Sequence, residues 1–221
     1  MKVKNCLWLL GIFLLLQKVN AQIQPPDESN RHLLAANLGF DYNIVAVNVS
    51  YGRYFANLKT APFAEITQNT ALLGLENFRL QTGVKSWLGS GERFLLNSSL
   101  ALTWVKSSNE AGIYNGLGAT LEVLPGVRLG RWALGAHLYA NPIVATHIEH
   151  STYYRDTFYK DAKDGWYEST ATNLRAGAFL SWFANDANSL EINLKSGYQT
   201  SGEFDGLIPN LYFLIGLNKR F

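Results

Sequence analysis

The chain has 221 residues, of which 48% are hydrophobic and 16% charged, and its 19 basic and 17 acidic side chains give a formal net charge of +2. Such a balance excludes the basic excess that recruits nucleic acid or an anionic membrane surface. The single cysteine, Cys6, excludes a fold that depends on disulfides.

Residues 1–21 have the three parts of a secretory signal peptide. Lys2 and Lys4 precede an apolar run from Leu7 to Leu16, and a small residue, Ala21, ends the segment. The run is too short to cross a bilayer of about 30 Å as a helix. We therefore expect cleavage after Ala21 and export of the remaining chain.

Export changes the charge and the cysteine count. Residues 1–21 hold three of the 19 basic side chains and none of the 17 acidic ones, which leaves 16 basic and 17 acidic groups, or −1. Cys6 lies before the apolar run and is removed with the signal. The mature chain then contains no thiol.

Residues 22–32 are polar, contain two prolines and predict a short lead-in, so the predicted domain begins at residue 33. From there, apolar and polar residues alternate, which is typical of β-strands with one apolar face. Seven strands are predicted, at 75–88, 92–106, 112–124, 127–148, 169–184, 188–201 and 208–221.

Residues 33–74 leave the number of strands open. Apolar residues lie at even positions up to Phe40 and at odd positions from Val45 onward. If Asp41–Ile44 is a bulge within one long strand, the total is eight, which we favour. If it is a tight hairpin turn and a weakly patterned strand follows near 62–70, the total is ten.

The last strand and the connections predict a membrane barrel. Leu211, Phe213, Ile215 and Leu217 share one face of the strand, opposite mostly polar or small residues. Short turns at 88–91, 125–126 and 185–188 alternate with longer polar segments at 107–111, 149–168 and 202–208. We expect an all-β, antiparallel, up-and-down transmembrane β-barrel with short periplasmic turns and longer outer loops.

With this pattern and the terminal segment Asn210–Phe221, the chain resembles the small bacterial outer-membrane β-barrel proteins. The resemblance implies an outer-membrane location, surrounding lipid and lipopolysaccharide, and recognition of Phe221 by the barrel assembly machinery. The sequence departs from the family at Lys219, where an apolar or aromatic residue is usual. A lysine at the membrane edge is tolerated because its long stem lets the ammonium reach water.

Ionisable residues recur on the face predicted to point inward. Because these residues include both cationic and anionic side chains, they can pair with one another, which predicts a closed, salt-bridged interior. The alternative is a narrow polar channel or a cavity for a small solute. The residues are Arg79, Lys85, Glu122, Arg131, His137, Arg175, Glu191, Lys195 and Arg220.

The segment His147-Ile148-Glu149-His150-Ser151 contains the residue types of a nucleophile, a general base and an orienting carboxylate. Some small outer-membrane barrels use such residues as lipid A deacylases. Here strand alternation places His150 and Ser151 on opposite faces and separates His147 from His150. We therefore predict neither a catalytic site nor a metal site, and no cofactor.

The segment 149–168 mixes aromatic and charged residues, a composition typical of binding surfaces and of loops that rest on lipid headgroups. The aromatic members are Tyr153, Tyr154, Phe158, Tyr159, Trp166 and Tyr167. We predict a non-enzymatic outer-membrane barrel whose outer loops contact the cell-surface layer or an external partner. A narrow pore or carrier and an outer-leaflet lipid-modifying enzyme are the alternatives.

Overall fold

The computed structural model describes residues 31–41, 44–69, 77–88, 93–184, 190–201 and 210–221. The predicted signal peptide, the lead-in up to residue 30, the turn at 185–188 and the segment 202–208 lie outside these residues, as does most of the turn at 88–91.

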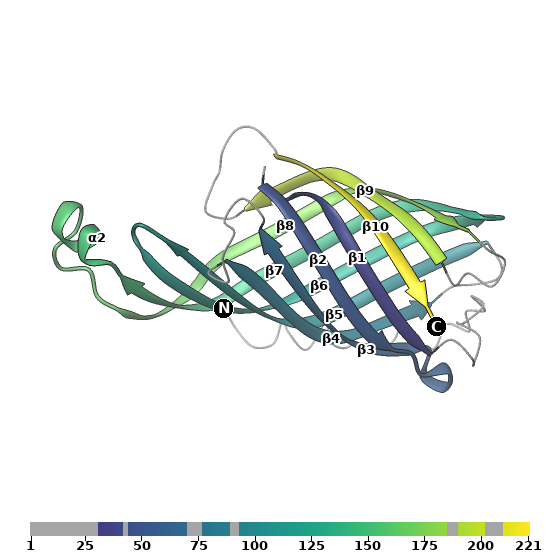
Figure 1. The fold of residues 1–221 in the computed structure, drawn as a ribbon, viewed down its shortest axis with the longest axis horizontal. Helices are drawn as coiled ribbons and strands as arrows, with labels where there is room; N and C mark the ends of the chain where they lie inside the picture. The colour runs from purple at the N-terminus through teal and green to yellow at the C-terminus, as the bar shows by residue number, and fades with distance from the viewer. Residues whose placement is uncertain (1–30, 42–43, 70–76, 89–92, 185–189, 202–209) are drawn as a thin grey trace.

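The described residues form ten β-strands that close into one antiparallel barrel, in which β1 pairs with both β2 and β10 (Figure 1). The strands are β1 His32–Asp41, β2 Ile44–Arg53, β3 Thr60–Asn69, β4 Phe78–Leu88, β5 Phe94–Asn109, β6 Gly112–Leu129, β7 Trp132–His150, β8 Gly165–Phe183, β9 Leu190–Ser201 and β10 Asn210–Arg220. A 3₁₀ turn, η1 (Ala56–Leu58), follows β2, and a short helix, α2 (Thr152–Thr157), follows β7. The predicted all-β barrel is confirmed.

The favoured count of eight strands is wrong, and the alternative of ten is correct. Asp41 pairs with Ile44 across a hairpin, so the two residues between them connect antiparallel strands and do not form a bulge. Phe40 lies opposite Val45 and points to the same side, which explains why the apolar positions change from even to odd. The weakly patterned segment forms β3, which pairs with β2 and β4.

The turn predicted at 125–126 is also wrong. Pro125 and Gly126 lie inside β6, opposite Leu96 and Leu95 of β5. The chain reverses at Gly130, whose positive φ is the left-handed conformation that glycine adopts without strain. The predicted longer segment 107–111 is likewise a tight connection between Asn109 and Gly112. Long and short connections therefore do not alternate strictly.

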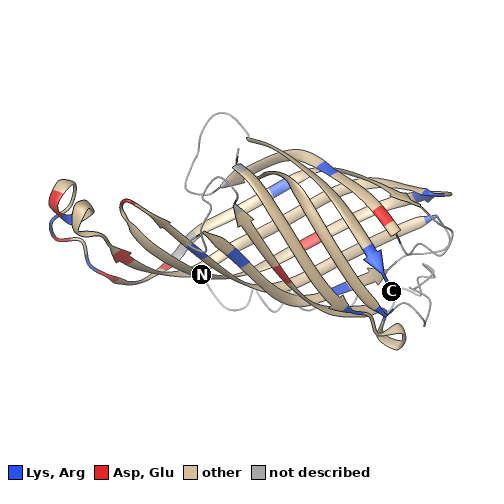
Figure 2. Ribbon diagram, in the orientation of Figure 1, with Lys and Arg blue, Asp and Glu red and all other residues tan. Residues whose placement is uncertain are grey.

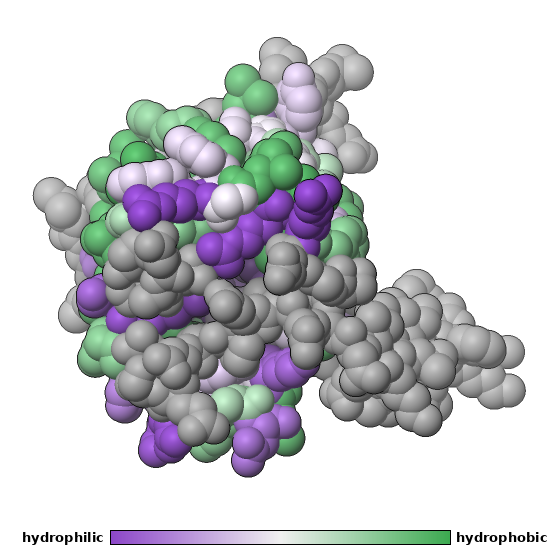
Figure 3. All heavy atoms as spheres, turned by 90° about the vertical axis from the view of Figure 1, so that its right-hand side faces the viewer, coloured by the Kyte–Doolittle hydropathy of each residue, from purple (hydrophilic) through white to green (hydrophobic). Residues whose placement is uncertain are grey.

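The outer wall of the barrel is apolar. Leu211, Phe213, Ile215 and Leu217 of β10 point outward and are 44–61% exposed, as the alternation predicts, whereas Tyr212 points inward and is 1% exposed. Figure 3 looks onto the end of the barrel next to the C-terminus, where hydrophilic residues gather and hydrophobic residues lie toward the rim. This distribution is the reverse of a water-soluble protein, in which a continuous exposed apolar surface is rare.

Aromatic residues mark two levels on the wall. Trp132 packs near Trp182 at one end, and Phe78 contacts Trp104 edge-to-face toward the other. Phe94 and Trp104 are ten residues apart on β5, or about 33 Å along the strand. A strand tilt of about 40° reduces this length to about 25 Å, the height of the apolar band of membrane barrels.

One side of the wall is longer than the other. Strands β5 to β8 contain 16, 18, 19 and 19 residues, whereas the other strands contain 10 to 12. They project beyond the mouth opposite the C-terminus and carry α2 at their tip (Figure 1). Relative to β6, Val144 is an extra residue between Ile143 and Ala145, so the projecting part of β7 reverses its inward and outward positions.

The pairing of β1 with β10 gives a direct test of closure. Ala36 and Leu217 are direct partners whose side chains both point outward. In a Cys6→Ser background, Ala36→Cys with Leu217→Cys should form a disulfide on mild oxidation, because antiparallel partners have suitable Cα separations of about 4.5–5.5 Å. The crosslinked chain should migrate faster on a denaturing gel. Ala36→Cys with Leu102→Cys on β5 is the matched control, and its crosslinking at an equal rate would contradict the register.

Candidate functional site

The structure brings together most of the residues predicted to point inward. Eight of the nine line one internal cavity of the described barrel. Arg131 is the exception, because the chain turns at 130–131 and leaves this side chain exposed just before β7. Figure 2 shows the charged positions spread along the strands of the barrel and concentrated again around α2. The lining members are Arg79, Lys85, Glu122, His137, Arg175, Glu191, Lys195 and Arg220.

Four of the inward side chains form a connected group, the interior cluster: Glu122, His137, Lys195 and Tyr212. Glu122 Oε1 accepts from Lys195 Nζ at 2.6 Å and lies 3.0 Å from His137 Nε2. Tyr212 Oη lies 2.6 Å from His137 Nδ1. Because a carboxylate only accepts, a neutral His137 carries its proton on Nε2, and its Nδ1 accepts from the Tyr212 hydroxyl.

The interior cluster spans the lumen. Glu122 on β6 reaches Lys195 on β9, and His137 on β7 reaches Tyr212 on β10, although neither pair of strands is adjacent. A Cβ added at Gly177 would lie 2.5 Å from Tyr212 Oη, so the absence of a side chain there makes room for the phenol. These contacts link strands that are three places apart around the barrel, and they occupy part of its interior.

A layer of neutral polar residues lies beside this cluster. Gln81 Nε2 donates to Thr103 Oγ1 at 3.1 Å, and Asn141 Nδ2 donates to Thr120 Oγ1 at 2.9 Å and to the Ala119 carbonyl at 3.0 Å. Asn141 is 0% exposed. The hydrogen bonds satisfy groups that would otherwise be buried without partners, and they tie strands β4 to β7 together from the inside.

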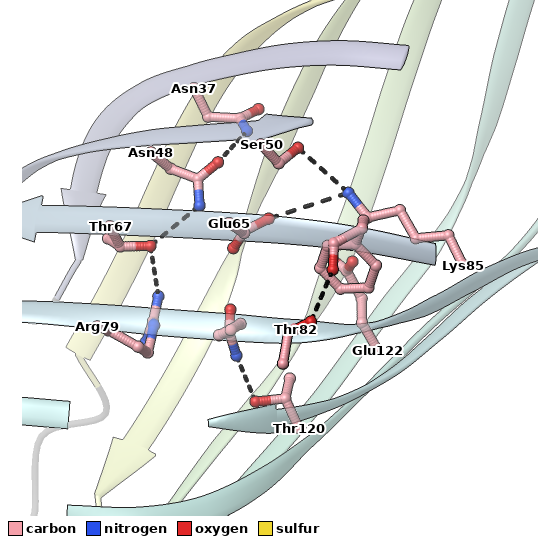
Figure 4. Close-up of polar contacts among 12 residues, drawn as sticks. Asn37, Asn48, Ser50, Glu65, Thr67, Arg79, Thr82, Lys85, Thr120 and Glu122 are labelled. Atoms are coloured by element: carbon pink, nitrogen blue, oxygen red, sulfur yellow. Dashed lines mark hydrogen bonds and ion pairs between the residues drawn. The ribbon is translucent and has the colours of Figure 1, made fainter. Parts of the chain in front are cut away.

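A second hydrogen-bonded chain runs along strands β1 to β4 (Figure 4). Asn37 donates to Asn48 at 2.9 Å, Asn48 donates to Thr67 at 3.0 Å, and Arg79 donates to Thr67 at 3.4 Å. The chain ties four neighbouring strands together from the inside.

The internal cavity has a volume of about 210 Å³. Its lining runs from the interior cluster to Leu33 and Arg220, next to the ends of β1 and β10. In Figure 4, Lys85 Nζ lies between Ser50 Oγ, at 3.4 Å, and Glu65 Oε2, at 3.9 Å. The cavity therefore lies toward the end of the barrel where β1 begins and β10 ends.

The residues at His147–Ser151, weighed above as weak candidates for catalysis, do not form a hydrogen-bonded triad in the described structure. Ser151 Oγ caps α2 by accepting from Tyr154 N at 3.0 Å, and it donates to the Glu110 carbonyl at 2.6 Å. His147 lies 3.6 Å from Glu149, on the same face, as the alternation predicts. The extra residue Val144 turns this face outward. Neither histidine contacts Ser151 Oγ through a hydrogen bond in the described structure. Among the described residues, no group of three or more His, Cys, Asp or Glu side chains is placed to hold a metal ion.

Asp164 organises the tip of the β7–β8 hairpin. Its carboxylate accepts from Arg155 and from the backbone N–H of His150 at 2.8 Å, and it lies 3.2 Å from His150 Nδ1. The hydrogen bonds from Arg155 and from His150 hold the pKa of Asp164 well below its usual range. The carboxylate thus stays charged at neutral pH and fixes α2 against the end of β7.

The aromatic residues predicted in this segment lie on the surface of the hairpin. Tyr153, Phe158, Tyr159 and Trp166 are 54–67% exposed. They form small contact groups: Phe158 packs against Tyr153 and Tyr154, and Trp166 packs edge-to-face on His147 at 5.2 Å. Tyr154 is less exposed because its ring stacks on His150 at 5.2 Å. We call this surface, made of residues 147–167, the aromatic tip.

Sequence reasoning missed Glu65 and Tyr212. Glu65 lies on β3, whose alternation is too weak to assign a face. Tyr212 lies on the inward face of the clearly patterned last strand, so its direction was available but its partner on β7 was not. In neither case does the linear sequence indicate which side chains meet across the lumen.

Comparisons with known proteins add no relative, since no protein-family model and no curated protein matches the sequence. Among the described residues, no helix is long and apolar enough to cross a membrane.

The interior cluster predicts a strong effect of removing its carboxylate. Glu122→Leu leaves the Lys195 ammonium and His137 without their acceptor, and should lower the free energy of unfolding by about 3 kcal/mol. Adding Lys195→Met should recover much of this loss. Urea unfolding in lipid vesicles measures both effects. Glu149→Gln, on an exposed carboxylate, is the control and should change stability by less than about 0.5 kcal/mol. A harmless Glu122→Leu variant would disprove the cross-lumen bridge.

Proposed function

We propose that this chain is an integral outer-membrane β-barrel protein that is neither a pore nor an enzyme, and that its projecting hairpin binds the surface layer of the cell. The observation that carries the proposal is the exposed apolar wall of a closed barrel. Each described strand pairs on both sides, so no edge is left to bind another chain. A wall of exposed Leu, Val and Phe side chains matches the lipid core of a bilayer.

The height of the aromatic tip supports a contact just outside the membrane. Trp104 belongs to the aromatic level on the side of the barrel from which the β7–β8 hairpin projects. It pairs with Leu117 on β6, which in turn pairs with Ala145 on β7. His147 and its partner Trp166 lie beyond this level, and β7 continues outward as far as His150. Because a strand rises by only about 3.3 Å per residue, we expect the tip to begin in the headgroup and inner saccharide region of an outer leaflet.

We infer that the partner is the saccharide part of lipopolysaccharide. Exposed rings such as Tyr153, Phe158 and Trp166 offer flat apolar faces to the C–H faces of sugars, and aromatic side chains with a polar group favour the membrane interface. The Asp164 contacts fix the position of α2 and so reduce the entropy lost on binding.

The geometry gives less support to the alternatives. A pore needs a continuous aqueous path, whereas the Glu122–Lys195 and His137–Tyr212 contacts cross the lumen. A hydrolase needs a nucleophile hydrogen-bonded to a base, whereas Ser151 Oγ is engaged with two backbone groups. In planar bilayers we expect no regular conductance steps from the purified protein, and regular steps would favour the pore.

Accessibility labelling tests the membrane location and the orientation together. In a Cys6→Ser background, Lys160→Cys at the aromatic tip should react with a membrane-impermeant maleimide on intact cells. Lys59→Cys, between η1 and β3 at the opposite end, should react only after the outer membrane is opened. The unheated protein should also migrate faster than the boiled protein on a gel. A protein that stays soluble without detergent would overturn the proposal.

The lipopolysaccharide contact has its own test. The variant Phe158→Ala with Trp166→Ala removes two exposed rings and should weaken binding of purified lipopolysaccharide to the detergent-solubilised protein about tenfold or more. Phe94→Ala removes an exposed ring at the other end of the wall and is the matched control. Equal binding by both variants would exclude the aromatic tip as the contact surface.

A further inference from the structure

We propose that the internal cavity binds a small organic carboxylate, with the Lys85 ammonium as its charge partner. The site lies toward the terminal end of the barrel, away from the aromatic tip, and does not depend on a contact with lipopolysaccharide. It therefore adds a second binding activity to the proposed function.

The charge of the cavity favours an anion. Among the described residues that line it, five cationic side chains point inward against three carboxylates. With His137 neutral, these eight groups have a formal charge of +2. Two of the carboxylates have other partners, since Glu122 binds Lys195 at 2.6 Å and Glu191 lies 4.0 Å from Arg220. The five cations are Arg79, Lys85, Arg175, Lys195 and Arg220.

Lys85 is the cation most available to a ligand. Its ammonium lies 3.4 Å from Ser50 Oγ, 3.9 Å from Glu65 Oε2 and 4.4 Å above the ring of Phe63. The first distance is long for a hydrogen bond, and the second is at the outer limit of an ion pair. Its side chain is 28% exposed, although it points into the barrel. A carboxylate ligand at about 2.8 Å would supply the short, charge-assisted hydrogen bond that the ammonium lacks.

Buried polar atoms next to the cavity also lack partners. The Tyr139 hydroxyl, Asn97 Oδ1 and Asn193 Oδ1 are buried without a hydrogen bond, and all three residues line the cavity. The Tyr139 residue is 9% exposed and Asn193 is 5% exposed. Buried polar groups normally have a partner, so these atoms indicate a polar occupant. The Tyr139 hydroxyl is a donor that suits the oxygen of an anion, and an amide can present its N–H₂ group instead of its oxygen.

Apolar side chains on the same cavity favour an organic anion over an inorganic one. Phe63, Leu124 and Phe179 line it together with the charged groups. Phe179 and Leu124 belong to the small apolar core with Leu95, Ala133 and Phe183. A volume of about 210 Å³ limits the ligand to a small molecule.

Calorimetric titration of the detergent-solubilised full-length protein tests this site with benzoate as the probe. We expect saturable binding of benzoate, with its neutral analogue benzamide and inorganic phosphate each at least about tenfold weaker. Absence of saturable benzoate binding in the millimolar range would overturn the site. Binding of benzamide as tight as that of benzoate would disprove the charge recognition, and tighter binding of phosphate would disprove the organic ligand.

Two variants at one ion pair should act in opposite directions. Lys85→Gln should weaken benzoate binding about tenfold, whereas Glu65→Gln should strengthen it several-fold because it removes the carboxylate that competes for the ammonium. Lys106→Gln, on β5 and outside the cavity lining, is the matched control and should leave binding unchanged. If Lys85→Gln does not fold, as judged by the gel shift, the Glu65→Gln result decides: unchanged or weaker binding contradicts the assignment to Lys85. The lipopolysaccharide test is unaffected by either result.

Discussion

The pairing of β1 with β10 is the constraint on which the rest of the structure depends. Eight residue pairs from Leu33–Arg220 to Phe40–Phe213 join the first strand to the last and leave neither with a free edge. Closure gives every strand one outward face and one enclosed face. The alternation of apolar and polar residues in the sequence therefore produces an apolar outer wall and a polar interior. Without this pairing, both edge strands would expose rows of unsatisfied backbone groups.

A barrel of ten strands must then fill its own interior. Side chains just fill a barrel of eight strands, and a wider one needs long side chains to cross it. Here the crossing groups are polar: Glu122 meets Lys195 and His137 meets Tyr212 between strands that are not neighbours. The charged residues are thus structural in the middle of the barrel. Toward the end of the barrel where β1 begins and β10 ends, charged side chains instead line a cavity. There Lys85 has only long-range polar contacts, at 3.4 and 3.9 Å.

The extension of β5 to β8 separates two surfaces that have different chemistry. The cavity lies toward the end of the barrel where β1 begins and β10 ends. The aromatic tip lies beyond the opposite mouth (Figure 1). The extra residue at Val144 reverses the inward and outward positions beyond it, which places His147 outside with Trp166 and turns His150 toward Tyr154. His147 and His150, although only three residues apart, therefore contact different parts of the hairpin.

The sequence by itself determined the all-β class, the outward face of the last strand and most of the inward ionisable residues, because each follows from an alternation that is local to one strand. It also argued against a triad at His147–Ser151 on the same grounds. Only the tertiary structure decided the number of strands, since a bulge and a tight hairpin at Asp41–Ile44 produce the same change of parity. It alone decided the turn at Gly130, the partners of Glu122 and Tyr212, and the place of Glu65 beside Lys85. These depend on which strands face one another across the lumen, and that arrangement is set by closure of the whole barrel.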